Sequence, residues 1–251
     1  MAKRRAPDFE PVTAISMQQK IETITVASWN IHAGIGSDGK FNADRIAAVI
    51  NTIDPDIIAI QEVESRTGFG ASVDLFTFLA RCLPGHLVDA KSITTRDGHY
   101  GQMLLSKFPL SHREVHDISY PDREPRKIID AHAQTPFGAW RVLATHLGLS
   151  AQERKFQLAR LSQLIAQPAA MPTVLIGDFN LWRNNRQLRR LDNLLPGGVT
   201  RHRTFPARLP LFALDRIWCG TGIEIRKSES VTTARSASDH LPIVADLCPA
   251  R

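Results

Sequence analysis

The chain has 251 residues, of which 43% are hydrophobic and 22% are charged, and its formal net charge at pH 7 is +6. This composition is typical of a soluble globular enzyme, and it excludes a disordered or fibrous protein. The 3 cysteines are widely spaced and cannot form a disulfide framework, and no apolar run approaches the ~20 residues of a membrane-spanning helix. We therefore expect a monomeric, cytoplasmic protein without a transmembrane segment.

Positive charge is concentrated in two segments of the chain. The N-terminal segment contains Lys3, Arg4 and Arg5 with no apolar run after them, which argues against a secretory signal and predicts a flexible basic tail over residues 1–20. Residues 183–208 hold 7 arginines and one acidic residue, Asp192. This second segment is either a solvated surface or a positive collar for an anionic substrate, because guanidinium groups match phosphate oxygens.

Apolar periodicity predicts that strands and helices alternate and that strands then become more frequent. The expected strands cover residues 21–31, 56–62, 86–90, 100–106, 127–133, 139–146, 172–179, 213–219, 223–227 and 241–247. The expected helices cover residues 43–53, 72–83 and 150–166. Asn42 is suited to cap the first helix, and Ser150 and Glu153 form a capping box at the third.

These elements predict how the chain is organised. Two groups of buried-type strands have amphipathic helices between them, and neither a Ser/Gly-rich linker nor a sequence repeat divides the chain. We expect one domain over residues 21–249. Its fold class is α/β, with two packed mixed sheets flanked by helices in a four-layer α-β-β-α sandwich.

Several of the apolar strands end in polar residues. Asp178 and Asn180 alternate at the end of one strand, so they point to the same side of an extended chain. The other polar residues at or near strand ends are Asn30, Glu62, His146, Asp215, Asp239 and His240. Each one alone has an ordinary interpretation as a turn residue, a loop cap or a core histidine. A carboxylate beside apolar strands nevertheless needs a cation or a hydrogen-bond donor.

Taken together, the segments around these residues resemble the endonuclease/exonuclease/phosphatase superfamily, which has the deoxyribonuclease-I-like fold. The matching segments are SWNIH (28–32), IIAIQEVE (57–64), ATHL (144–147), IGDFN (176–180), LDRIW (214–218) and SDHLPI (238–243). They occur in the order that the family shows and cover residues 28–243. The combination is far more specific than any one of the segments.

The resemblance implies a phosphoester hydrolase in which water attacks phosphorus in line. It implies that Glu62 binds Mg²⁺ or Mn²⁺, with Asn30 beside it and Asp239 supporting the metal or its waters; hard cations of this kind prefer oxygen ligands. His240 is expected to be the general base, polarised by Asp215. The remaining catalytic residues implied are Asp178 and Asn180, which orient the water, and His146, which donates to the phosphate or the leaving oxygen.

The resemblance also implies residues that contact the substrate. Arg123 and Arg126 both lie where related proteins carry a phosphate-contacting residue, and the sequence does not decide between them, although Arg126 is favoured. Gln102 lies near the position of the carboxylate that orients the second histidine in deoxyribonucleases. Arg183 begins the arginine-rich segment three residues after Asn180, which places it at the rim of the site.

Two features separate this chain from the abasic-site endonucleases of the superfamily: His32 stands where those enzymes have an acid, and the Thr145-His146-Leu147 motif is present. Glu64 is unfavourable near duplex DNA. These features favour a phosphodiesterase that acts on a small or lipid-linked phosphoester, similar to bacterial sphingomyelinases and phospholipid phosphodiesterases, with docking at a membrane surface left open. A DNA or RNA nuclease and a catalytically silent binding module are the alternatives.

Overall fold

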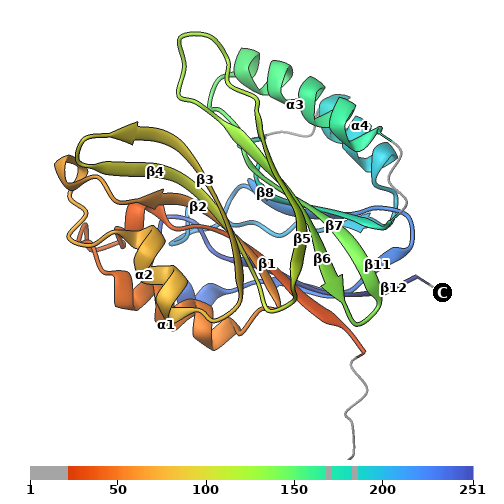
Figure 1. The fold of residues 1–251 in the computed structure, drawn as a ribbon, viewed down its shortest axis with the longest axis horizontal. Helices are drawn as coiled ribbons and strands as arrows, with labels where there is room; N and C mark the ends of the chain where they lie inside the picture. Colours follow the sequence, from red (N-terminus) through yellow and green to blue (C-terminus); the bar gives the residue numbers. More distant parts are fainter. Residues whose placement is uncertain (1–21, 168–170, 183–185, 251) are drawn as a thin grey trace, which may run out of the picture.

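The computed structural model describes residues 22–167, 171–182 and 186–250, so the predicted tail (1–20) and Arg183 lie outside the described part of the chain. Two six-stranded sheets pack face to face, and helices cover the outer face of each (Figure 1). This architecture confirms the predicted α/β sandwich with two packed mixed sheets and flanking helices.

The first sheet has the strand order β11-β12-β1-β2-β4-β3. Its strands are β1 (Ile24–Asn30), β2 (Ile57–Glu64), β3 (His86–Thr95), β4 (Gly98–Ser106), β11 (Ile223–Ser230) and β12 (Ile243–Pro249). β1 and β2 run parallel, and the other neighbours run antiparallel. Helices α1 (Ala43–Ile53) and α2 (Leu75–Cys82) cover its outer face through an apolar layer that includes Trp29 and Ile60.

The second sheet has the strand order β5-β6-β7-β8-β10-β9. Its strands are β5 (Leu110–Asp117), β6 (Lys127–Thr135), β7 (Gly138–His146), β8 (Thr173–Asp178), β9 (Gly198–Val199) and β10 (Asp215–Cys219). Only β7 and β8 run parallel in this sheet. Helices α3 (Ala151–Ile165) and α4 (Arg186–Leu194) cover its outer face, where Leu143 and Leu175 meet Leu161 and Leu191.

The central strands are apolar on both faces because each face packs against another layer. Val26 and Ile57 of the first sheet meet Val142 and Ile176 of the second in the buried layer between the sheets. Strands buried on both sides have nearly continuous apolar sequences. This is why β1, β2, β7 and β8 could be predicted so clearly.

The predicted helix caps are present. Asn42 accepts a hydrogen bond from the backbone N–H of Arg45 at 2.8 Å, and α1 ends at Asp54, which has left-handed backbone angles. Ser150 Oγ accepts from the Glu153 N–H, and Glu153 Oε2 accepts from the Ser150 N–H, which completes the capping box of α3. Each cap of this kind contributes about 1 kcal/mol.

Some elements differ from the prediction. β5, β9 and α4 were not predicted from the sequence, and β3 extends to Thr95, five residues past its predicted end at Ala90. β5 lies at the edge of its sheet and most of its residues are exposed, so it lacks the apolar alternation that marks a strand. Short 3₁₀ turns cover His32–Gly34, Thr67–Phe69 and Thr232–Ala234. None of the helices in the described part is long and apolar enough to cross a bilayer.

Candidate active site

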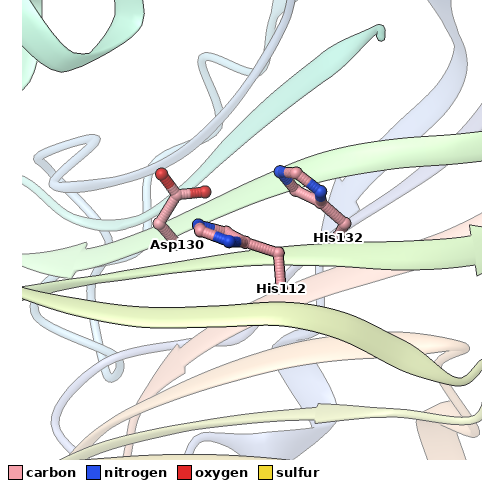
Figure 2. Close-up of side chains that lie close together, drawn as sticks. All are labelled: His112, Asp130 and His132. Atoms are coloured by element: carbon pink, nitrogen blue, oxygen red, sulfur yellow. The ribbon is translucent and has the colours of Figure 1, made fainter.

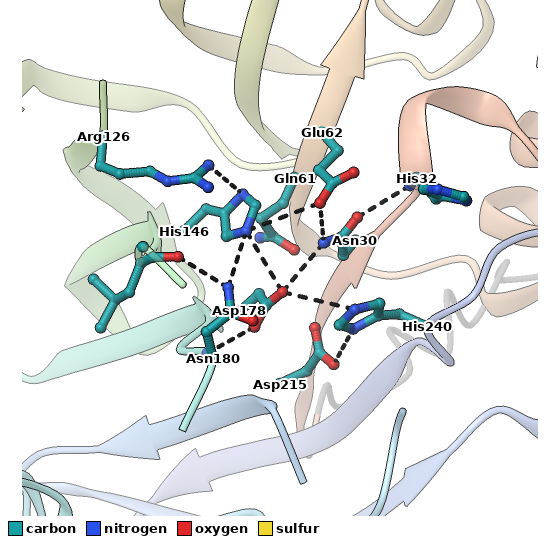
Figure 3. Close-up of polar contacts among 12 residues, drawn as sticks. Asn30, His32, Gln61, Glu62, Arg126, His146, Asp178, Asn180, Asp215 and His240 are labelled. Atoms are coloured by element: carbon teal, nitrogen blue, oxygen red, sulfur yellow. Dashed lines mark hydrogen bonds and ion pairs between the residues drawn. The ribbon is translucent and has the colours of Figure 1, made fainter. Parts of the chain in front are cut away.

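The predicted residues converge where strands from both sheets end. In the first sheet Asn30 is the last residue of β1 and lies beside Gln61 of β2. In the second sheet Asp178, the last residue of β8, lies between His146 of β7 and Asp215 of β10. A hydrogen bond from Asn30 Nδ2 to Asp178 Oδ2, 3.1 Å long, joins the two sheets at this point (Figure 3).

Glu62 is directed into the site by a bulge in β2. The register between β2 and β4 shifts between Gln61 and Val63, and Glu62 has a φ of 56°. Bulges re-aim a side chain away from strict alternation and are common beside active sites. Glu62 Oε1 accepts a hydrogen bond from Asn30 Nδ2 at 2.8 Å, and about a quarter of the side chain (24%) is exposed.

The orientation of the Asn30 amide is fixed by the backbone. Its Oδ1 accepts from the N–H of His32 at 3.0 Å, so its Nδ2 faces the carboxylates of Glu62 and Asp178. The Asn30 oxygen therefore already has one partner, while its amide group holds the two carboxylates in place. Any contact with a metal would use the second lone pair of that oxygen.

Asp215 and His240 form the predicted pair. His240 Nδ1 donates to Asp215 Oδ2 at 2.9 Å, which leaves His240 Nε2 facing Asp178 Oδ2 at 3.9 Å (Figure 3). Burial acts to lower the pKa of His240, but the charges of Asp215 and Asp178 outweigh burial and raise that pKa to about 10. Nε2 is the ring atom available for proton transfer at the site.

Sequence reasoning missed two residues that hold this pair. Thr204 Oγ1 donates to Asp215 Oδ2 at 2.5 Å, and the Phe205 ring packs on the His240 ring with centroids 4.8 Å apart. Both lie in the loop before β10 and precede a cis Phe205–Pro206 bond. No motif marks them, because their contact with Asp215 or His240 exists only after the chain folds.

His146 is held in one tautomer by Arg126. Arg126 can only donate, so its contact of 3.0 Å with His146 Nδ1 makes Nδ1 an acceptor, and the carboxylates near Nε2 favour the ring proton on that atom. Asn180 Nδ2 lies 3.4 Å from Nε2 but makes its shorter hydrogen bond to the Leu147 carbonyl. Nε2 lies 3.6 Å from Asp178 Oδ2 and 4.0 Å from Glu62 Oε1. Burial, with the positive charge of Arg126, lowers the pKa of His146 well below its usual value, so the ring is a neutral donor.

The other predicted substrate contacts are less direct. Arg126 is buried against His146 and pairs with Glu124 at 2.7 Å, whereas Arg123 is exposed in the preceding loop, so the structure brings Arg126 to the site. Gln102 is buried, and its Nε2 donates to the Lys127 carbonyl. It lines a small cavity with Arg126 and His146 and does not hydrogen-bond to the His146 ring.

Asp178 and Asn180 complete the centre of the site. Asp178 Oδ1 accepts from the Asn180 N–H at 2.9 Å, and Asn180 Nδ2 donates to the Leu147 carbonyl. Burial, together with the charge of Asp215, raises the pKa of Asp178 to about 6. These hydrogen bonds fix the positions of Asp178 and Asn180. The other oxygen of Asp178, Oδ2, faces His146 and Asn30.

Two sets of side chains fit a divalent cation. Burial raises the pKa of Glu62, and the negative charge of Asp239 raises it further, so a cation between these carboxylates would relieve their repulsion. Oxygen donors of this kind suit Mg²⁺ or Mn²⁺. The ligand atoms of Asp178, Asp215 and His240 also lie within 4.8 Å of one another. The chemistry available is metal-assisted proton transfer around a phosphoryl group.

Comparisons with known proteins agree with this geometry. The sequence model of the Endonuclease/Exonuclease/phosphatase family matches residues 27–240. The protein YbhP of Escherichia coli strain K12, described as uncharacterized, is 29% identical over 240 residues, which cover 88% of this chain and 95% of YbhP.

Solved structures share the fold. An endonuclease/exonuclease/phosphatase from Beutenbergia cavernae superposes with a TM-score of 0.72 at 22% identity, covering 91% of this chain and 72% of that one. A mannosyl-6-phosphatase from Bacteroides thetaiotaomicron gives a TM-score of 0.71 at 18% identity, covering 89% of this chain and 99% of its own. At these identities the likeness shows the fold alone.

Proposed function

Because the chain belongs to the endonuclease/exonuclease/phosphatase family, whose members are metal-dependent hydrolases of phosphoester bonds, we propose that it is a Mg²⁺-dependent phosphodiesterase. We propose that its substrate is a small or lipid-linked phosphoester. The observation that carries the reaction is the convergence of Glu62, Asp178 and the Asp215–His240 pair at the ends of strands from two sheets.

The proposed mechanism assigns one task to each side chain. Glu62, with Asp239 and Asn30 beside it, would hold a Mg²⁺ or Mn²⁺ ion, which would neutralise charge on the phosphoryl oxygens. The negative charges that raise the pKa of His240 would be offset by a cation at Glu62, so that the ring is neutral and its Nε2 can accept a proton from the attacking water. Asp215 holds Nδ1 and compensates the positive ring that forms. Asp178 and Asn180 orient that water. His146, with its proton on Nε2, donates to the leaving oxygen.

Apolar side chains around the site support the substrate class. Exposed large apolar residues follow the strands that carry Glu62, His146 and Asp178, or precede Asp215: they are Phe69, Val73, Leu149, Trp182, Leu209 and Leu211. The Trp182 ring packs against Phe205 and Phe212, and Phe205 in turn contacts His240. An apolar rim beside the reacting groups suits a substrate with an apolar portion, and it also suits docking at a lipid surface.

We further propose that the protein is cytoplasmic and acts as a single catalytic domain over residues 21–249, as a monomer, with peripheral contact at a membrane. The apolar rim supports the membrane contact. Arg123 and Arg183 stay predictions as phosphate contacts.

A panel of substrates tests the proposal. Bis-p-nitrophenyl phosphate, anionic phospholipid vesicles, mannose 6-phosphate and plasmid DNA are each incubated with Mg²⁺, Mn²⁺ or EDTA. We expect metal-dependent turnover of the diester and the phospholipid, abolished by EDTA. The sugar monoester is included because a structural neighbour is named a mannosyl-6-phosphatase. The absence of metal-dependent turnover on every substrate other than nucleic acid would contradict the proposed substrate class.

Paired substitutions sharpen the assignment to a lipid substrate. Leu209→Ser with Leu211→Ser removes part of the apolar rim, and we expect slower turnover on vesicles with unchanged turnover of the soluble diester. Val115→Ser is the control, because Val115 is also an exposed apolar residue but lies on the edge strand β5. Equal effects of the two changes on vesicle turnover would show that the apolar rim does not bind the lipid.

A nuclease is the second candidate, and the loop before β10 favours it. Arg203 and Arg208 are exposed on either side of Thr204, so positive charge flanks the Asp215–His240 pair. Metal-dependent nicking of plasmid DNA that falls in Arg203→Ala but not in Arg189→Ala, a variant on α4, would support it. Nicking that persists in His240→Ala would indicate a contaminating nuclease.

A further inference from the structure

A second group of histidines and carboxylates lies on the outer face of β5 and β6. His112, Glu114 and His116 alternate along β5, and Asp130 and His132 alternate along the neighbouring β6. Glu114 is the register partner of Asp130, and Ser111, next to His112, is the partner of His132. Ile129 and Ala131 of β6 point into the layer between the sheets, so Asp130 and His132 face the other way, towards the outside of the sandwich. Figure 2 shows His112, Asp130 and His132 directed towards one another.

A bulge brings the two histidines together. The register between β5 and β6 shifts between Ser111 and Arg113, so His112 is the extra residue. The rings of His112 and His132 then lie with centroids 4.7 Å apart at an interplanar angle of 30°. One ligand atom from each of His112, Asp130 and His132 lies within 4.8 Å of the others. Ligand atoms around a tetrahedral zinc ion are about 3.3 Å apart, so small side-chain rotations close the site.

The neighbours of these residues match the second layer of a metal site. Glu114 lies 3.6 Å from His112 Nε2 and 3.5 Å from His116 Nδ1. Asp130 is 2% exposed and accepts hydrogen bonds from Arg141 Nε at 3.0 and 3.1 Å. Carboxylates beside ligating imidazoles, and donors to ligating carboxylates, fix the orientation of metal ligands.

The ion pair between Asp130 and Arg141 accounts for the burial of a charged carboxylate, but it does not account for the histidines grouped around that carboxylate. The guanidinium already balances the charge of Asp130. His116 Nε2 is nevertheless buried without a hydrogen-bond partner, 3.5 Å from Asp130 Oδ2. Buried polar atoms in folded proteins nearly always have a partner. Three imidazoles therefore surround one carboxylate, and one of them has an orphaned ring nitrogen.

We propose that His112, His132 and Asp130 bind a divalent transition-metal ion, with Zn²⁺ as the best fit. Two imidazoles and one carboxylate favour zinc and its neighbours over Mg²⁺, which prefers oxygen ligands alone. His132 pairs with Arg141, five residues before His146 on β7, so the ion is ~17 Å along the strand from the catalytic histidine. The ion joins the edge strand β5 to β6, and its role is to stabilise that edge.

Zinc binding measured without any assay of activity tests this proposal. Equilibrium dialysis is done in millimolar Mg²⁺ on the full chain carrying Cys82→Ser, because Cys82 is an exposed free thiol that could itself bind zinc. His112→Ala and His132→Ala are compared with His86→Ala, the control histidine on β3 of the other sheet. We expect the first two variants to bind one zinc ion fewer per chain than the control does.

Thermal unfolding gives an independent measurement. At a zinc concentration 100 times the dissociation constant we expect a rise in Tm of about 5 °C or more, present in the His86→Ala variant and lost in His112→Ala. His112 is exposed, so its removal leaves the fold intact even where His132→Ala does not. Equal zinc stoichiometry in His112→Ala and the control would overturn the proposal, and so would unchanged Tm in zinc for the protein with an intact cluster.

Discussion

The active site and the cluster on β5 and β6 both combine histidines with carboxylates, but they hold them differently. At the active site His240 and His146 each have a defined partner, Asp215 and Arg126, and both rings are buried. On β5 the ring of His112 is exposed and its closest acidic contact is at 3.6 Å. A site for proton transfer requires fixed tautomers, whereas a metal site can be assembled by its ion.

The largest expected effect is on kcat, which should depend on the active-site histidine His240 and not on His112 of the cluster. His240→Ala removes the general base, and we expect kcat to fall about 10³-fold with little change in KM, because proton transfer is needed in the transition state. His112→Ala is expected to leave both values unchanged. Steady-state kinetics on bis-p-nitrophenyl phosphate with Mg²⁺ measures this. A rise in KM alone for His240→Ala would contradict the assignment of the general base.

Two glutamates on β2 have different expected roles: Glu62 binds the cation, and Glu64 stabilises the fold. Glu62 faces the site, while Glu64 is buried and pairs with Arg66 at 2.7 Å. Glu62→Gln should weaken the activation by Mg²⁺ about 100-fold at unchanged stability, because one charged ligand is lost. Glu64→Gln should lower the free energy of unfolding by about 3 kcal/mol, because it leaves Arg66 unpaired.

Mg²⁺ titrations of activity and urea unfolding of the two variants make this comparison. The prediction is wrong if Glu62→Gln unfolds as easily as Glu64→Gln, because Glu62 would then serve the fold. It is also wrong if both variants have the Mg²⁺ dependence of the native protein.

The sequence predicts a site residue well where a regular strand positions that residue, and poorly where a bulge or a folded loop positions it. Asn30, His146 and Asp178 come at the ends of strands buried on both faces, and such strands have apolar sequences that can be read directly. The bulge at Glu62 could not be read, because positive φ at a non-glycine residue depends on its tertiary setting. The sequence marked Glu62 only as a polar residue at the end of an apolar strand, and the family resemblance supplied its expected role.

The cluster on β5 and β6 was not predicted, because β5 lacks the apolar pattern of a buried strand. Leu110–Asp117 is an exposed edge strand with one buried residue, Leu110, so its sequence lacks the apolar alternation of a strand. His112 and His132 are 20 residues apart, and their contact depends on a register shift that no local pattern encodes. Thr204 was missed in the same way, because its partner Asp215 is reached only through the folded loop.

A smaller effect is expected for Thr204, which positions Asp215 and does not reach the substrate. Thr204→Val keeps the shape of the side chain but removes the hydrogen bond to Asp215 Oδ2. We expect kcat to fall about tenfold, equivalent to ~1.4 kcal/mol, with KM unchanged and a shifted pH profile. The control is Thr200→Val, in which a buried threonine loses the hydrogen bond that its Oγ1 accepts from the Ile217 N–H at 2.9 Å, a contact that does not involve Asp215 or His240. Thr204 Oγ1 likewise accepts from the Asp215 N–H, at 3.4 Å.

A purely structural role of Thr204 would lower the stability of both variants equally and leave both kcat values and pH profiles alone. Urea unfolding measured beside the kinetics makes the distinction. Restoration of kcat by Thr204→Ser, which keeps the hydroxyl group, would complete the assignment.

The smallest expected effect is on the stability of the protein without transition metal. It tests whether the histidines of the cluster, unlike those of the active site, contribute little to the fold. In EDTA, His112→Ala should change the free energy of unfolding by less than about 0.5 kcal/mol, because an exposed imidazole on an edge strand has little to lose. His146→Ala should cost about 2 kcal/mol, because it leaves a cavity and removes a partner of buried Arg126. Urea unfolding of both variants measures the difference. If His112→Ala were as costly in EDTA as His146→Ala, the imidazoles on β5 would be part of the folded core, and an ion would not be needed to hold them together.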